Sequence, residues 1–123
     1  MACITDASVI LPGKVLYHVY GGNKNPELSK RIITSKPSST GRFNFICLYF
    51  SRTDNTMHEY HSHGYLRDNG IGAGYNLNRM FITESDALEF VLECFSGEFS
   101  TEHNRLAAER LEANKADMEY WDY

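Results

Sequence analysis

The sequence predicts an α+β fold in which an antiparallel sheet of about four to five strands, residues 1–83, is followed by two helices packed on it. Two observations support this fold class. Before residue 84, short segments rich in β-branched and aromatic residues alternate with turn residues. After it, apolar residues recur at helical spacing. The 123 residues have the length of a single domain.

Five segments are predicted to be strands: residues 14–20, 31–35, 42–50, 57–66 and 75–83. The first, KVLYHVY, is closed by Gly21 and Gly22, and the polar residues 23–30 are expected to form a connection. Residues 42–50 are apolar at nearly every position, which is typical of a central strand covered on both faces. Residues 51–56 (SRTDNT) carry turn-forming side chains and predict a hairpin, from which the fourth strand returns antiparallel.

The first predicted helix starts after Thr83, because Thr83 and Asp86 have the spacing of a capping box. Gly97 is expected to end it. The residues expected on its apolar face are Leu88, Val91, Leu92 and Phe95. The second predicted helix covers residues 101–120, and its narrow stripe comprises Ala107, Leu111, Asn114, Met118 and Trp121. That stripe is expected to face the sheet or to form a homodimer through the C-terminal helices.

The charge of the chain is divided unevenly along this single domain. Residues 1–83 hold nine basic and five acidic side chains, a net charge of +4, whereas residues 84–123 hold three and eleven, a net charge of -8. The total is -4. Such an asymmetry between a basic, β-rich part and an acidic, helical part bears on the choice of partner rather than on the fold.

Cysteine usage and the absence of long apolar runs indicate the compartment. The three cysteines, Cys3, Cys47 and Cys94, form no close pair, which argues against a disulfide framework and fits a reducing cytoplasm. No apolar run approaches the roughly 18 residues that span a membrane. The N-terminal residues lack the basic start and long apolar stretch of a signal peptide. A cytoplasmic protein without a membrane partner is expected, within the host cell if a phage encodes it.

Histidines in the segment HEYHSHGYL raise the question of a metal site. On a strand, His61 and His63 would share one face with Glu59, and two imidazoles at this spacing can chelate one metal ion. Zinc would still need a ligand from another strand, such as His18 or Cys47, and no pattern fixes that register. We therefore favour a polar strand face and expect neither a metal nor another cofactor.

Residues 70–74, GIGAG, form a glycine-rich loop. Their spacing differs from the dinucleotide fingerprint G-x-G-x-x-G, a strand rather than a helix is expected to follow, and no P-loop lysine is present. A tight loop between strands is the simplest interpretation. Because arginine and tyrosine flank the loop, it is also a candidate contact for a ligand or a partner protein. The candidate binding residues are Arg67, Gly70, Gly72, Gly74, Tyr75, Asn78 and Arg79.

The stretch GAGY, a basic residue soon after it and the helix SDALEFVLE, within residues 64–93, resemble a pattern in small uncharacterised proteins of phages and plasmids. Members of that group pair β-hairpins with a G-x-G-Y-type segment that leads into an alanine-rich helix. This chain departs from the pattern, because NLNRMFIT intervenes before the helix and the helix lacks an Ala-Ala pair. The resemblance implies a mobile-element accessory protein with no known chemistry.

No nucleophile elbow, zinc-protease motif or P-loop occurs, so no enzyme class is supported. The first hypothesis is a phage-type accessory protein that binds and inhibits or modulates a host protein, such as a nucleic-acid-targeting defence complex of the CRISPR or restriction type. Its contacts would come from the acidic helices, at Glu109 and Glu112, and from the aromatic tail, at Tyr120 and Trp121.

Two alternatives remain open. One is a small-ligand or nucleotide binder that uses the glycine-rich loop. The other is a sheet that binds single-stranded nucleic acid, with basic residues for phosphate and aromatic residues for stacking. The aromatic residues considered for that role are Phe43, Phe45, Tyr49, Tyr60 and Tyr65. The acidic balance of the whole chain weighs against the second alternative.

Overall fold

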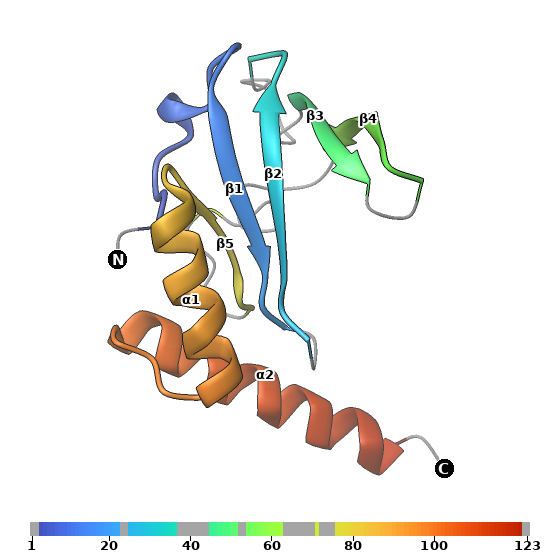
Figure 1. Cartoon of the computed structure of the whole chain (residues 1–123). Coiled ribbons are helices and arrows are strands. Elements are labelled where there is room, and N and C mark those ends of the chain that lie inside the picture. The colour runs from blue at the N-terminus through green and yellow to red at the C-terminus, as the bar shows by residue number, and fades with distance from the viewer. Residues whose placement is uncertain are drawn as a thin grey trace.

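The computed structural model confirms the predicted α+β fold, with five antiparallel strands followed by two helices (Figure 1). The strands are β1 (Val15–Tyr20), β2 (Glu27–Ile33), β3 (Phe45–Ser51), β4 (Thr56–Ser62) and β5 (Asn78–Phe81). A short 3-10 helix, η1 (Ala7–Val9), precedes them, and α1 (Glu84–Ser96) and α2 (Glu102–Trp121) follow. The structure describes residues 3–22, 25–36, 45–51, 54–62, 71 and 76–121, and only the backbone of residues 62 and 114–121.

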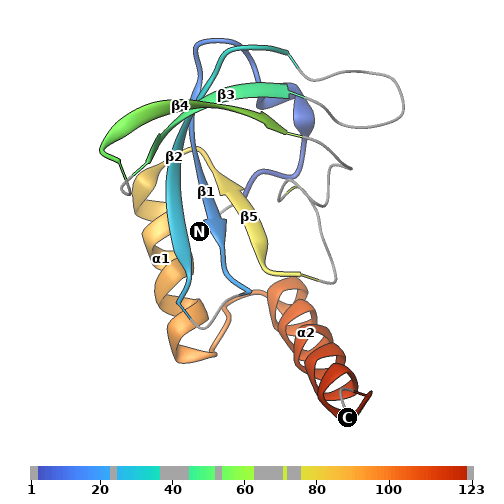
Figure 2. The same ribbon diagram turned by 90° about the vertical axis from the view of Figure 1, so that its right-hand side faces the viewer.

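The strands follow the order β4-β3-β2-β1-β5, so the last strand pairs with the first. Side chains alternate between the two faces of each strand. Leu16, His18 and Tyr20 of β1 lie on one side, which we call the pocket face. Val19 lies on the other, which we call the helix face because α1 covers it. Figure 2 shows β3 and β4 running at a steep angle to β1, as expected for a strongly twisted sheet.

The helix face holds the first hydrophobic core. Its fully enclosed members are Val19, Leu77, Phe81, Ala87, Phe90 and Ala107. The rings of Phe81 and Phe90 lie 5.5 Å apart, and Phe99 adds a third ring 6.2 Å from Phe90. Helix α1 packs across β1, β2 and β5, whereas α2 runs below the sheet and extends away from it (Figure 1).

The predicted orientation of α1 is wrong for three of its four residues. Val91 packs against the helix-face core, but Leu88, Leu92 and Phe95 are exposed, Leu92 by 68%, and the buried residues are Ala87 and Phe90. Apolar side chains surround much of this helix, so its periodicity alone does not choose the buried side. Packing does, because the small Ala87 allows close approach to the sheet and Phe90 fills the space between Phe81 and Phe99.

The pocket face holds the second hydrophobic core, which is covered by the chain before β1. Its members are Ile4, Ile10, Leu16, Ile33, Phe45, Cys47, Ile71 and Met80. The backbone N–H of Ile4 donates to the carbonyl oxygen of Met80 at 2.7 Å, which fixes the N-terminal segment along β5. Both faces of the central strands are therefore covered at one end, and the pocket face opens toward the other.

The expectation that residues 42–50 form the central strand is also wrong. β3 lies next to the edge strand β4, and β2 is the middle strand. Phe50 of β3 and its partner Met57 of β4 are each 48% exposed, since the contacts of α1 are with β1, β2 and β5. β2 begins at Glu27, four residues before the predicted strand, because Glu27 already pairs with Tyr20 across the hairpin.

The helix ends behave as predicted. The Thr83 hydroxyl accepts a hydrogen bond from the Asp86 N–H at 3.2 Å, and Gly97 adopts a left-handed conformation with φ of 76° at the end of α1. The Thr101 hydroxyl accepts from the Asn104 N–H at 3.3 Å at the start of α2. Among the described residues, no helix is long and apolar enough to cross a membrane.

Candidate functional site

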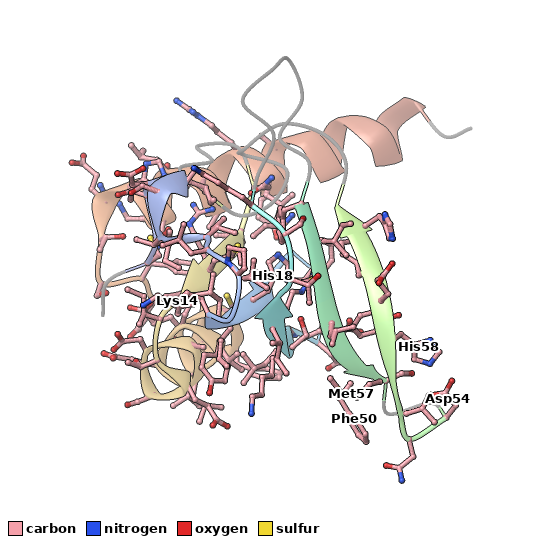
Figure 3. The ribbon with its side chains drawn as sticks, turned by 90° about the horizontal axis from the view of Figure 1, so that it is seen from above. Lys14, His18, Phe50, Asp54, Met57 and His58 are labelled. Atoms are coloured by element: carbon pink, nitrogen blue, oxygen red, sulfur yellow. The ribbon has the colours of Figure 1, made fainter. Side chains whose placement is uncertain are left out.

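A cavity of about 460 Å³ lies on the pocket face between β1, β2, β3, β4 and β5. It is lined by His18, Tyr20, Glu27, Leu28, Ser29, Arg31, Phe45, Tyr49, Tyr60, Asn78 and Met80. Most of these positions alternate along their strands, so the antiparallel registers gather them on one side of the sheet. In Figure 3, His18 lies near the middle of the sheet, away from Phe50 and Met57 on the outer hairpin. We call this cavity the sheet pocket.

Aromatic rings and one guanidinium form the outer wall of the sheet pocket. The Arg31 guanidinium carbon lies 4.7 Å from the centre of the Tyr60 ring, a cation–π contact. Its Nε donates to the Ser29 hydroxyl at 3.2 Å. Tyr49 meets Tyr60 edge-on at 6.1 Å and stacks on His58 at 5.8 Å. The packing of these rings holds the guanidinium over Tyr60.

His18 is a neutral group at the base of the sheet pocket. Burial and, to a smaller extent, the nearby Arg31 guanidinium lower the pKa of its imidazole to about 3. One ring nitrogen is therefore a donor and the other an acceptor at neutral pH. Asn78 contributes a second polar atom, since its Oδ1 is buried and accepts no hydrogen bond within the described part of the chain.

The depressed pKa of His18 predicts acid sensitivity. Above pH 6.5 the imidazole is neutral in the folded and in the unfolded chain, so it adds no pH dependence to the free energy of unfolding. Below pH 6.5, the imidazole of the unfolded chain binds a proton that the folded chain excludes, and the free energy of unfolding falls until about pH 3. We expect about 2 kcal/mol of lost stability between pH 8 and pH 5.

Urea unfolding at pH 8, 6.5 and 5 measures this loss. A His18→Gln variant removes the ionisable group and is the control, because the remaining histidines contribute equally to both proteins. The slope of stability against pH should be shallower in the variant. Identical slopes would contradict the burial of a neutral His18.

A second hollow of about 610 Å³ lies where the β1–β2 hairpin, the end of α1 and α2 meet, and we call it the helix groove. It is lined by Gly21, Gly22, Leu77, Cys94, Gly97, Phe99, Arg105, Ala108, Glu109, Leu111 and Glu112. The floor is apolar, while exposed Glu109 and Glu112 lie on its α2 side. Arg105 is 3.5 Å from Glu102, so part of its charge is already balanced.

Gly21 allows the hairpin to close against α1 at this groove. A Cβ atom at position 21 would lie 2.7 Å from the Cys94 Sγ and 2.9 Å from the Leu77 carbonyl oxygen. The Gly21 N–H also donates to that carbonyl at 3.0 Å. The close backbone approach at the floor of the groove thus depends on the missing side chain.

Arg79 is buried on the helix face, with 0% of its surface exposed. Its Nε donates to the Asn104 Oδ1 at 2.9 Å and its Nη1 to the Asn78 carbonyl oxygen at 2.6 Å. Nη2 has no partner in the described part of the structure. Burial lowers the pKa of the guanidinium, which stays charged at neutral pH because arginine is not deprotonated in proteins. Arg79 therefore links β5 to α2.

Of the residues predicted at the glycine-rich loop, the structure describes Asn78 and Arg79. Arg67, Gly70, Gly72, Gly74 and Tyr75 lie outside the described residues. Asn78 and Arg79 are adjacent in β5, so they point to opposite faces of the sheet. Asn78 reaches the sheet pocket, whereas Arg79 is enclosed and not available to a ligand at the surface.

The predicted acidic residues are placed together, since Glu109 and Glu112 both line the helix groove. The side chains of Tyr120 and Trp121 lie outside the described part of the chain, as does the predicted Met118 contact. The homodimer through the C-terminal helices stays a prediction. Of the aromatic residues proposed for base stacking, Phe45, Tyr49 and Tyr60 line the sheet pocket, and Phe43 and Tyr65 are not described.

The histidines of β4 form separate pairs with acids. His58 lies 2.6 Å from Asp54 in the turn, and His61 lies 2.6 Å from Glu59 on the opposite face. Among the described residues, no group of three potential ligands converges on a metal position. His63 lies outside that set, so a site that includes it stays untested.

A family profile that describes phage g100-like proteins matches residues 4–94. The chain belongs to the phage g100-like protein family. The match covers the sheet, the sheet pocket and almost all of α1, and it ends before α2. No curated protein and no solved structure is significantly similar to the chain.

The family assignment identifies a phage protein, one of the two sources that the resemblance to proteins of phages and plasmids implied, while the G-x-G-Y segment itself finds no support in it. In this phage g100-like protein, sequence analysis missed Arg31 and Asn78 as members of one pocket. The alternation of polar residues in YHVY and ELSKRI indicates that each of these strands has a polar face. It does not reveal that β1 pairs with both β2 and β5, which is the pairing that brings Arg31 and Asn78 to one pocket.

Proposed function

We propose that this phage g100-like protein acts without catalysis, by binding a host protein through the helix groove. The observation that supports the proposal is the combination of an apolar floor with exposed Glu109 and Glu112 at its side. A groove of about 610 Å³ admits several side chains of a partner. Protein interfaces usually have apolar contacts at the centre and charged or polar residues at the rim.

The occupant we propose is a basic segment of the host protein. Residues 84–123 carry a net charge of -8, so the field around the groove attracts positive charge. A lysine or arginine of the segment would place its aliphatic stem against Phe99 and Leu111 and its charge beside Glu109.

Basic segments of this kind line the nucleic-acid channels of defence complexes, where they neutralise phosphate charge. We therefore propose that the protein inhibits or modulates a nucleic-acid-targeting host defence complex, of the CRISPR or restriction type, by occupying such a segment. The proposal predicts that nucleic acid and the phage protein compete for the same host surface. Binding should weaken as salt rises, because rim charges are screened.

Reversing two charges at the groove tests the proposal. We expect Glu109→Lys combined with Glu112→Lys to weaken capture of the host partner by at least about tenfold, since two attractive contacts become repulsive. The tagged protein first captures the partner from host lysate. The affinity of each variant for the purified partner is then measured.

The matched control is Glu84→Lys combined with Glu89→Lys, which makes the same change of charge on exposed positions of α1 outside the groove. This control should bind like the unmodified protein. Circular dichroism and thermal melting establish that both variants fold. Equal capture by the groove variant and the control would overturn the groove as the binding surface, and a captured partner that nucleic acid does not displace would overturn the competitive mechanism.

A further inference from the structure

We propose that the sheet pocket binds a nucleoside 5′-monophosphate whose base carries an exocyclic amino group, with the base against the tyrosines and the phosphate at Arg31. The inference is separate from the helix groove and does not depend on it. Its source is the set of pocket side chains, which offer a stacking surface, acceptors for an amino group and a positive charge in one cavity.

Size and wall chemistry suit a single nucleotide. The volume of about 460 Å³ is in the lower part of the range for small-molecule sites, which is about 300–1,000 Å³. Tyr20 and Tyr60 are 41% and 40% exposed, so aromatic surface remains available at the mouth. Nucleobases stack on such rings. Met80 and Phe45 form apolar parts of the wall.

Unused acceptors favour a base with an amino group. Asn78 Oδ1 is buried in the pocket wall and has no hydrogen-bond donor in the described part of the chain. A buried acceptor without a partner costs about 1–3 kcal/mol, which a ligand donor would recover. The carboxylate of the exposed Glu27 lies on the same wall and can accept a hydrogen bond from a ligand donor. The neutral His18 can donate to a ring nitrogen of the base or accept from its amino group.

Arg31 provides the site for the phosphate. Its Nε is engaged by the Ser29 hydroxyl and its plane rests near Tyr60, so the guanidinium is held in place. Within the described residues no carboxylate lies in ion-pair contact with it. A fixed guanidinium without an acidic partner is suited to bind phosphate oxygens through two parallel N–H donors.

Titration of the 123-residue chain with AMP, IMP, CMP and UMP, followed by calorimetry and by amide NMR shifts, tests the proposal. We expect AMP to bind more tightly than IMP, because IMP carries a carbonyl where AMP has an amino group. For the same reason, CMP should bind more tightly than UMP. The largest changes in amide NMR shift should occur in residues of β1, β2 and β5. A single-stranded oligo-A is titrated in parallel, to distinguish a free nucleotide from a base within a strand.

Arg31→Gln should weaken AMP binding by at least about tenfold, through loss of charged hydrogen bonds. The matched control is Lys30→Gln, which removes one positive charge from the neighbouring exposed position on the opposite face. Asn78→Ala should abolish the preference for AMP over IMP.

A lack of binding by every nucleotide and by the oligonucleotide at millimolar concentration would overturn the proposal, as would equal effects of Arg31→Gln and Lys30→Gln. Equal affinity for AMP and IMP would overturn the role of Asn78. The oligonucleotide can also bind where AMP does not. If Arg31→Gln weakens that binding and Lys30→Gln does not, the result supports the base site and indicates that its ligand is a base within a strand.

Discussion

Replacing Asn104 with alanine is expected to destabilise the protein by about 3 kcal/mol. The Asn104 Oδ1 accepts the hydrogen bond of the Arg79 Nε at 2.9 Å, and both side chains are almost fully buried. Alanine removes the acceptor and leaves a buried charge, one nitrogen of which already has no partner among the described residues. A loss of this size is a large share of the roughly 5–15 kcal/mol that stabilises a typical domain. Urea unfolding monitored by circular dichroism measures it.

A double-mutant cycle separates the buried charge from the lost packing. Arg79→Met together with Asn104→Leu replaces both side chains with apolar groups, so neither leaves the other's polar side chain buried without its partner. We expect this double variant to be more stable than Asn104→Ala alone. If the effects of Arg79→Met alone and of Asn104→Leu alone instead summed to the effect of the double variant, Asn104 and Arg79 would not be energetically coupled.

Replacing Phe90 with alanine is expected to cost about 3–5 kcal/mol. Phe90 is fully buried between Phe81 and Phe99, and shortening it to a methyl group leaves a cavity between α1 and the sheet. Thermal and urea unfolding measure the loss. Leu92→Ala is the matched control, because Leu92 is also an apolar residue of α1 but is 68% exposed.

The control should change stability by no more than about 0.5 kcal/mol. This pair of variants distinguishes the two possible orientations of α1. Had the stripe of Leu88, Leu92 and Phe95 faced the sheet, Leu92→Ala would be the damaging change and Phe90→Ala the mild one. A larger loss for Leu92→Ala would therefore contradict the observed packing.

The two candidate sites differ in how much of them the sequence predicted. Glu109 and Glu112 were selected from the acidic balance of the helices, and the structure adds the apolar floor provided by the β1–β2 hairpin and by Leu77. The sheet pocket was foreseen only in part. Tyr49 and Tyr60 were considered for stacking, but the grouping of Arg31 with Asn78 depends on strands that are far apart in the chain.

The local elements of this protein could be predicted from its sequence. Alternating apolar residues predicted the strands, and Thr83 and Gly97 marked the ends of α1, because capping and strand propensity depend on neighbouring residues. Turn residues predicted the β3–β4 hairpin for the same reason. These interactions act over a few residues, so they can be recognised without knowledge of the fold.

The strand order, the buried side of α1 and the burial of Arg79 depend instead on contacts between elements that are distant in the chain. An apolar run such as residues 45–50 is equally compatible with a central position and with one beside the edge strand, and an apolar helix is compatible with more than one orientation. Packing between elements selects among these alternatives. The same selection places Asn78 in a pocket and Arg79 in the interior, although they are neighbours in the chain.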